Sequence, residues 1–215
     1  MYKRLVTFGC SFTYGHGLAD CHVAPNHAGP NPSKFAWPQL LATRRQLNCV
    51  NLSRPGGSNK LMWWRAVNFK FKPTDVVIFY TTFPDRDCIL NNSDSIDDLH
   101  ETYQLGLWPS KDKRTRSYRD LVVHSNSTKN WEYQSYVYLD YAYQHIFKQG
   151  VKNIFFFKHQ HQIWQHQLPD WATFKFETPE ISGMIKKWDY ALDRSHPGPK
   201  SHKQIAKRLD AYLNV

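Results

Sequence analysis

The sequence predicts an α/β fold with a mostly parallel sheet. Short apolar and β-branched runs recur along the 215 residues, and segments with helical spacing of their apolar residues lie between them. Strands that alternate with helices in this way are typical of β-α-β units, in which neighbouring strands run parallel. Hydrophobic residues make up 41% of the chain and charged residues 21%, so we expect one globular domain over residues 1–215.

The expected strands are residues 4–8, 48–52, 75–80 and 153–157. The run 75–80 reads Asp-Val-Val-Ile-Phe-Tyr, and its nearly continuous apolar character is typical of a strand that is buried on both faces. The first run ends at Gly9, and the second ends shortly before Gly56 and Gly57. Glycines at these places allow the chain to turn sharply after each strand.

The expected helices are residues 35–46, 58–68, 131–149 and 199–213. The third of them carries apolar residues broadly on one side, at Tyr133, Val137, Tyr141 and Ile146, and Gly150 is well placed to end it. Two regions lack such patterns. Residues 19–33 are expected to form a loop, and the long polar segment 85–130 predicts a partly ordered insertion or lid.

The chain is basic, with 28 Lys and Arg residues against 18 Asp and Glu residues, and its formal charge is +10. Such a charge attracts polyanions, including nucleic acid. The basic residues are scattered along the sequence, however, and no recognition motif accompanies them. Nucleic-acid binding is therefore not favoured.

The cysteines and the N-terminus indicate a cytoplasmic protein. The four cysteines form no Cys-x-x-Cys pair and fit no zinc spacing, which favours reduced thiols. The apolar run at residues 5–8 is too short for a signal peptide, and no run approaches the length of a membrane span. We therefore expect a soluble protein without a transmembrane segment.

A serine follows the first expected strand directly, in the motif Gly-Cys-Ser-Phe-Thr-Tyr-Gly at residues 9–15. Ligands of parallel α/β sheets bind beyond the carboxyl ends of the strands, so Ser11 stands where catalysis would occur. Taken alone, the motif is more typical of an ordinary strand-to-helix turn that Ser11 or Thr13 caps.

A second motif near the C-terminus supplies the partners that a serine nucleophile needs. Asp193 and His196 stand three residues apart, before Pro197 and Gly198, which predict a loop. A serine hydroxyl requires a general base, and a histidine that a carboxylate orients is a common one. Asp189 is a second candidate for the acid, but the Asp-x-x-His spacing favours Asp193.

Together the two motifs resemble those of the SGNH/GDSL hydrolase family, in the same order along the chain. That family places its nucleophile after the first strand in a Gly-Asp-Ser block, which here is Gly-Cys-Ser, and an Asp-x-x-His block before the last helix. The resemblance implies a three-layer α/β/α sandwich with a flavodoxin-like sheet. It also implies Ser11 as nucleophile, His196 as base and Asp193 as acid, with no cofactor and no metal.

The resemblance further implies an oxyanion hole formed by Ser11 and a glycine after the second strand, with Gly56 the best match and Gly57 an alternative. The family's third block, Gly-x-Asn-Asp, is expected after residues 75–80, where Phe83 takes the place of the Asn. Phenylalanine cannot donate a hydrogen bond, and losing one oxyanion donor typically lowers kcat by about 10²- to 10³-fold. The residues that could substitute are Thr81, Thr82, Arg86 and the more distant Asn59.

His159, His161 and His166 cluster after the fourth expected strand. No cysteine or acidic residue lies close to them in the sequence, so a zinc site is not favoured. We instead assign His159 and His161, together with Arg86, to contacts with substrate.

The sequence thus predicts a serine esterase that cleaves a small acyl ester, such as an O-acetyl group on a carbohydrate, through an acyl-serine intermediate. The alternative is an SGNH fold that is catalytically weak or inactive and that binds a ligand or has a structural role. Phe83 and the polar insertion favour this alternative.

Overall fold

The computed structural model describes residues 4–24, 27–90, 103–107, 111–125, 128–158, 164–177 and 188–213. Its central sheet contains four strands, β1 (Arg4–Phe8), β4 (Asn48–Asn51), β5 (Asp75–Thr81) and β8 (Asn153–Lys158). Their order in the sheet is β4-β1-β5-β8, and each neighbouring pair is parallel. In chain order this is 2-1-3-4, the order of a flavodoxin-like sheet. The predicted parallel α/β fold is confirmed.

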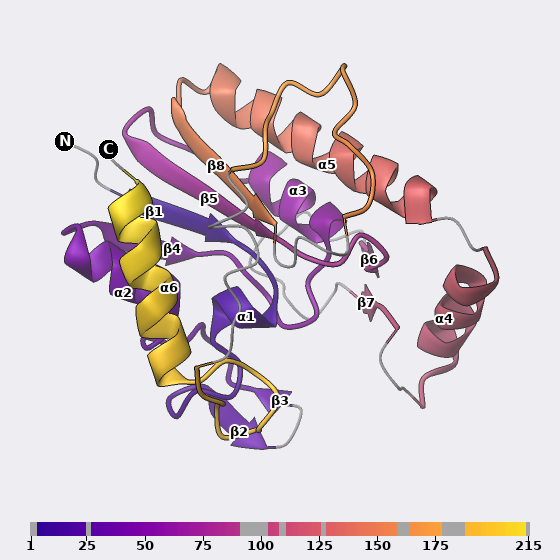
Figure 1. Cartoon of the computed structure of the whole chain (residues 1–215), viewed down its shortest axis with the longest axis horizontal. Coiled ribbons are helices and arrows are strands. Elements are labelled where there is room, and N and C mark those ends of the chain that lie inside the picture. Colours follow the sequence, from indigo (N-terminus) through magenta and orange to yellow (C-terminus); the bar gives the residue numbers. More distant parts are fainter. Residues whose placement is uncertain are drawn as a thin grey trace.

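Helices cover both faces of the sheet and form a three-layer sandwich (Figure 1). One face carries α2 (Trp37–Arg44) and α6 (Pro199–Tyr212), and the other carries α3 (Asn59–Val67) and α5 (Thr128–Lys148). Each of these helices lies where the sequence predicts one, with ends that differ by a few residues at most. No helix among the described residues is long and apolar enough to cross a membrane.

The two apolar cores follow from the alternation of side chains along the strands. In β5, Val77 and Phe79 face α3 and α5, whereas Val76, Ile78 and Tyr80 face α2 and α6. On the first face Phe79 stacks between Phe8 of β1 and Phe156 of β8, with ring centroids 4.5 and 4.6 Å away. A strand that is buried on both faces therefore needs the continuous apolar run seen at residues 75–80.

The face that α5 buries differs from the one the sequence predicts. Val137 and Tyr141 are 49% and 64% exposed. The buried apolar side chains of α5 are instead Tyr136, Leu139, Ala142 and Ile146. Aromatic and aliphatic residues surround this helix on several sides, so their spacing alone does not single out the face that meets the sheet.

Regular structure also occurs in the two regions that lack a clear sequence pattern. The expected loop 19–33 contains β2 (His22–Ala24) and β3 (His27–Ala28), and α1 (Ser11–Tyr14) precedes it. The segment 85–130 contains β6 (Asp87–Ile89), its antiparallel partner β7 (Tyr103–Leu105) and α4 (Lys113–Ser125). Residues 91–102, 108–110 and 126–127 of that segment lie outside the described residues. Strands of two or three residues are too short to show periodicity.

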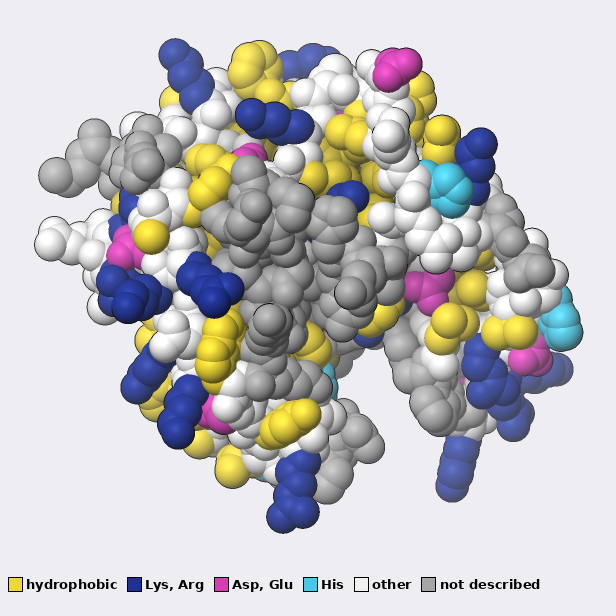
Figure 2. All heavy atoms as spheres, viewed as in Figure 1, with side chains coloured by type: hydrophobic (Ala, Val, Ile, Leu, Met, Phe, Trp, Pro, Cys, Tyr) yellow, Lys and Arg dark blue, Asp and Glu magenta, His cyan; other side chains and the backbone are white. Residues whose placement is uncertain are grey.

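The helix α4 lies to one side of the sandwich (Figure 1). It buries only Thr115 and Tyr118, and the Tyr118 hydroxyl donates a hydrogen bond to the carbonyl of Asp85 over 2.7 Å. Figure 2 shows Lys and Arg side chains scattered over the visible face, with a group of them around this helix, whose sequence contributes Lys113, Arg114, Arg116 and Arg119.

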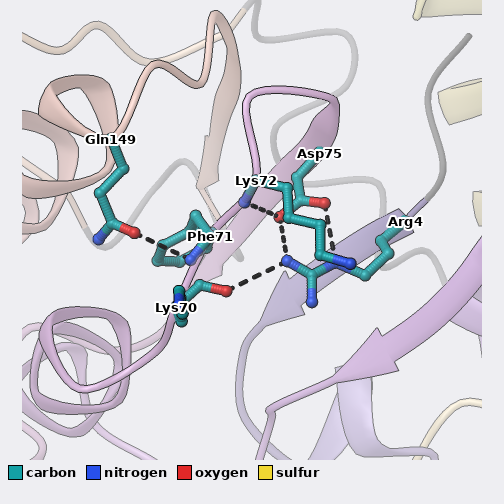
Figure 3. Close-up of polar contacts among 6 residues, drawn as sticks. All are labelled: Arg4, Lys70, Phe71, Lys72, Asp75 and Gln149. Atoms are coloured by element: carbon teal, nitrogen blue, oxygen red, sulfur yellow. Dashed lines mark hydrogen bonds and ion pairs between the residues drawn. The ribbon is translucent and has the colours of Figure 1, made fainter.

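A partly buried ion pair joins the amino ends of two central strands (Figure 3). Arg4 of β1 donates from Nε to Asp75 Oδ1 over 2.8 Å and from Nη2 to Oδ2 over 2.6 Å, and the side chain of Asp75 is fully buried. The backbone amide of Lys72 also donates to Asp75, over 2.8 Å. The carboxylate of Asp75 is therefore satisfied by a bidentate guanidinium and a backbone donor.

We expect Arg4→Ala to lower the free energy of unfolding by about 3 kcal/mol, because the substitution leaves a buried carboxylate without its cation. Arg44→Ala is the matched control. The side chain of Arg44 is 51% exposed, and its partner Asp210 retains Arg45, so a loss below about 1 kcal/mol is expected. Urea denaturation of both variants measures the difference, and equal losses would contradict a stabilising role for the Arg4–Asp75 pair.

Candidate active site

Ser11 begins the short helix α1 directly after β1, and only 7% of its surface is exposed. The turn requires glycine at position 9, since a Cβ there would lie 2.1 Å from Thr13 Oγ1. Gly15 ends the helix in the left-handed conformation, with φ of 84°. The carboxyl end of β1 thus presents Ser11 on a tight turn, as the sequence predicts.

The segment after β4 lies against this turn. The amide of Arg54 donates to the carbonyl of Gly9 over 3.1 Å, and the side chain of Asn51 donates to the carbonyl of Thr13 over 2.9 Å. Gly56 has φ of 71° and, among the described residues, its N–H donates to no acceptor. Gly57, by contrast, donates to the carbonyl of Arg54 over 3.0 Å. Of the two glycines, Gly56 is therefore the better placed to donate to a ligand.

The loop that carries Asp193 and His196 is a narrow hairpin. Tyr190 and Pro197 form an antiparallel bridge, and the amide of Ala191 donates to the carbonyl of His196 over 2.9 Å. The amide of Leu192 donates to the carbonyl of Gly17 over 3.0 Å. This last bond fixes the hairpin to the chain just beyond α1, although 175 residues separate Gly17 from Leu192 in the sequence.

Asp193 and His196 form a strong hydrogen-bonded pair. His196 Nδ1 lies 2.5 Å from Asp193 Oδ2, and the backbone amides of Ser195 and His196 donate to Asp193 Oδ1 over 3.0 and 3.1 Å. Burial alone would raise the pKa of Asp193, but these donors and the imidazole outweigh it and lower that pKa to about 2. Asp193 is therefore an ionised carboxylate at neutral pH. His196 is its partner, with 18% of the side chain exposed.

Asp189, the other candidate acid, has a different role. Its carboxylate accepts hydrogen bonds from the backbone amides of Lys200 and Ser201, over 2.9 and 2.8 Å, at the start of α6. Burial opposes ionisation of Asp189, but these bonds outweigh it and lower its pKa. Asp189 thus caps a helix, whereas Asp193 contacts the histidine.

The Asp193–His196 pair lies next to the turn that carries Ser11. Phe12, which follows Ser11, contacts the His196 ring edge to face, with centroids 5.3 Å apart. Among the described residues the Ser11 hydroxyl makes no side-chain hydrogen bond, to His196 or to any other group. Hydrogen bonds of this kind are often long without substrate and shorten in the complex.

His16 is a component of the site that sequence reasoning missed. Its ring stacks on that of His196, with centroids 4.5 Å apart and planes inclined by 24°. A histidine directly after the motif at residues 9–15 carries no signal of its own in the sequence, since its contact with His196 forms only when the C-terminal hairpin docks. The cluster is therefore visible only in three dimensions.

His16, Asp193 and His196 are also the described residues that could hold a metal ion, since one ligand atom from each lies within 4.8 Å of the others. A metal lies close to the plane of an imidazole that binds it. The two stacked rings would have to separate and rotate before both could direct a lone pair at one ion. The arrangement seen here is that of a carboxylate and two imidazoles in direct contact.

The third expected block, after β5, contains no amide at position 83. Phe83 stacks against Arg86, whose Cζ lies 4.7 Å from the ring centroid, and Arg86 Nη1 donates to Thr82 Oγ1 over 2.9 Å. Asn59 is fully engaged elsewhere. Its amide exchanges hydrogen bonds with the backbone of Thr82 and donates to Ser135, so it holds α3, β5 and α5 together.

His159 and His161, which the sequence assigns to substrate contacts, lie outside the described residues. Their neighbour His166 is described, and its Nδ1 lies 3.3 Å from the buried carboxylate of Glu132 on α5. Arg86 lies beside Phe83 at the carboxyl end of β5, on the same edge of the sheet as Ser11.

Comparison with known proteins finds similar folds but no similar sequence. No protein-family model matches the sequence, and no curated protein matches it. An acetyl xylan esterase from the rumen bacterium Butyrivibrio proteoclasticus has a similar structure, with a TM-score of 0.51 and 14% identity over 99% of this chain. The chain therefore shares the fold of that esterase, a three-layer α/β/α sandwich like the one that the SGNH/GDSL resemblance implies. It spans 64% of the length of that esterase.

Two further solved structures resemble the chain less. A carbohydrate esterase described as having divergent catalytic and non-catalytic binding functions gives a TM-score of 0.48 at 12% identity, over 98% of this chain and 68% of its own. A protein of the G-D-S-L lipolytic family from Desulfitobacterium hafniense gives 0.34 at 13% identity, over 98% of this chain and 99% of its own. At these identities the likeness concerns the fold.

Proposed function

We propose that this protein is a serine esterase with Ser11 as nucleophile, His196 as general base and Asp193 as the acid that orients it. One observation carries the proposal. The hydrogen-bonded Asp193–His196 pair is fixed against the turn that presents Ser11, through the Leu192–Gly17 bond and the Phe12–His196 contact. A carboxylate, an imidazole and a serine hydroxyl grouped at the carboxyl edge of a parallel sheet have the composition of a hydrolase triad.

In this proposal each group has its own step. Asp193 accepts a hydrogen bond from His196 Nδ1, which leaves Nε2 of that ring with its lone pair for the Ser11 hydroxyl. His196 removes the proton from Ser11 as the oxygen attacks the acyl carbonyl carbon, and then gives this proton to the departing alcohol. Water, activated by the same histidine, then attacks the acyl-serine, and the acid product leaves Ser11 free.

Backbone amides supply the oxyanion hole in this proposal. The N–H groups of Ser11 and Gly56 are the candidates, since neither donates to an acceptor among the described residues. The N–H of Gly57 and the side-chain amide of Asn59 already donate hydrogen bonds within the fold, and Thr82 donates its N–H to Asn59. Two backbone donors without a third from a side chain predict a slow enzyme, because each donor contributes about 10²–10³ to kcat.

A small acyl ester is the proposed substrate, with an O-acetyl group on a carbohydrate as the favoured example. The similar fold of the acetyl xylan esterase supports this choice. Burial of Ser11 to 7% exposure favours a short acyl group, because a long chain would need space that the surrounding turn occupies. The +10 charge favours an anionic alcohol such as an acidic glycan, which it would attract electrostatically.

Labelling with a fluorophosphonate probe tests the proposal. We expect covalent labelling of the wild-type protein and none of Ser11→Ala. Mass spectrometry of the labelled peptide distinguishes Ser11 from Ser195, whose hydroxyl lies 3.0 Å from His196 Nδ1. Absence of labelling and of p-nitrophenyl acetate hydrolysis in a folded wild-type protein would favour the alternative, an inactive binding module, which Phe83 in place of an amide donor supports.

Gly17 offers a test of the acid that substitutes none of the proposed catalytic residues. A Cβ at position 17 would lie 2.6 Å from Asp193 Cγ, so Gly17→Ala should displace the carboxylate and lower kcat by about 10²-fold. Gly150→Ala is the control, because Gly150 has a similar φ of 86° but follows α5, where its Cβ would meet Pro73. Both variants should lose about 1–2 kcal/mol of stability, and only Gly17→Ala should lose activity. Equal kcat values for the two would contradict the role of Asp193.

A further inference from the structure

His16 connects the proposed nucleophile and the proposed base. Its backbone amide donates to the carbonyl of Ser11 over 3.0 Å, and its ring stacks on His196. The residue is 6% exposed. We propose that His16 is a positioning residue, whose ring holds the His196 imidazole in the orientation that directs Nδ1 to Asp193. This inference rests on the proposed function, since it assigns His16 a part in the same site.

The remaining contacts of His16 support a role in which the face of its ring, rather than a ring nitrogen, contacts His196. Its Nε2 is buried and has no hydrogen-bond partner among the described residues. A histidine that served only to satisfy polar groups in the core would form such a bond. The stacked contact with His196 is the ring interaction that the structure records for it. With Phe12 meeting the His196 ring edge to face, that ring has aromatic contacts from two residues of one turn.

Charge also favours a neutral, stacked His16. Burial lowers the pKa of His16, and the facing imidazole of His196 lowers it further, while Asp193 opposes the effect. His22 of β2 and His27 of β3 are the other titratable groups that act on it, and both lower its pKa. At neutral pH a neutral ring therefore lies against His196. It can stack on the imidazolium that forms during the reaction without adding a second positive charge.

Three variants at this position test the proposal with p-nitrophenyl acetate as substrate. His16→Ala should lower kcat by about tenfold, the size of one aromatic contact, and change KM by less than about twofold. His16→Phe restores a ring and should recover kcat to within about threefold of the wild type, whereas His16→Gln should not. His22→Ala controls for the loss of a nearby histidine and should leave kcat unchanged. Thermal unfolding identifies any variant that fails to fold.

A second readout does not depend on activity. The ring protons of His196, assigned by NMR, should move downfield in His16→Ala, because the ring current of His16 is lost, and should return upfield in His16→Phe. Unchanged His196 resonances together with an unchanged kcat in folded His16→Ala would overturn the proposal. If His16→Ala shifts the His196 resonances as expected but Ser11→Ala hydrolyses the ester as fast as the wild type, the proposed function fails. The stacking of His16 on His196 is then still supported.

Titration of the wild type with Zn²⁺ separates positioning from metal binding. Under the positioning proposal, micromolar Zn²⁺ leaves the His16 and His196 resonances in place. Saturable shifts of both at one equivalent of Zn²⁺, abolished in His16→Phe, would show that the pair serves as a metal site and would overturn positioning by stacking.

Discussion

Ser11→Ala is expected to lower kcat for p-nitrophenyl acetate by about 10⁴- to 10⁶-fold, because the proposed acyl intermediate forms on the oxygen that this substitution removes. Residual hydrolysis would come from the oxyanion donors alone. KM should change little, since the hydroxyl contributes to the transition state far more than to binding of the ester. Steady-state rates over a range of ester concentrations measure both quantities.

The substitution removes one oxygen from a side chain that makes no hydrogen bond among the described residues, so the fold should not suffer. Thermal unfolding of Ser11→Ala should match the wild type to within a few degrees. A variant that unfolds normally and still hydrolyses the ester within tenfold of the wild-type rate would remove Ser11 from the mechanism.

Asp193→Asn is expected to lower kcat by about 10⁴-fold. An amide in place of the carboxylate can donate a hydrogen bond to His196 Nδ1. This bond favours the imidazole tautomer that carries its proton on Nε2, the nitrogen that should accept the proton of Ser11. The substitution also removes the negative charge that stabilises the imidazolium. Single-turnover measurements of p-nitrophenol release follow this acylation step directly.

Asp189→Asn is the matched control, with the same chemical change four residues earlier. It weakens the cap of α6 and should cost about 1 kcal/mol of stability, with kcat within a few-fold of the wild type. If Asp189→Asn proved the more damaging substitution for kcat, the acid would have been assigned to the wrong carboxylate.

The lowered pKa of Asp193 also makes the stability of the folded protein depend on pH. Because that pKa is lowered to about 2 from an ordinary value of 3.8, the folded state binds its proton less readily than the unfolded state. The stabilisation that ionised Asp193 provides is complete above about pH 4 and disappears as the pH falls towards 2. Asp193→Asn should therefore reduce the dependence of stability on pH in this window.

The fold could be predicted because strands that are buried on both faces consist of nearly continuous apolar residues. Continuous apolar runs such as 75–80 identify the parallel strands, and glycines such as Gly9 mark their ends. The polar helix α4 and the pairs β2–β3 and β6–β7 escaped prediction, since they bury few side chains or are too short for periodicity. The prediction of which face of α5 is buried was wrong, because apolar residues occur on several sides of that helix.

The site likewise contains residues that local sequence motifs predict and residues that they do not. Local motifs predict Ser11, Asp193 and His196 as a group, and the structure brings the segments that carry them together. His16 and Gly17 could not be found in this way. Their importance depends on contacts across nearly the whole chain, a ring stack for His16 and a bare α-carbon facing Asp193 for Gly17.

The bond between Leu192 and Gly17 also concerns how the molecule assembles. The chemical groups on either side of it come from opposite ends of the chain, so we expect them to meet only after the intervening strands have formed a sheet and the last helix has docked. Loop closure over such a separation comes late, because its entropic cost must be met by contacts already made. Recovery of catalysis during refolding would therefore report the final docking step, after far-ultraviolet circular dichroism has regained most of its amplitude.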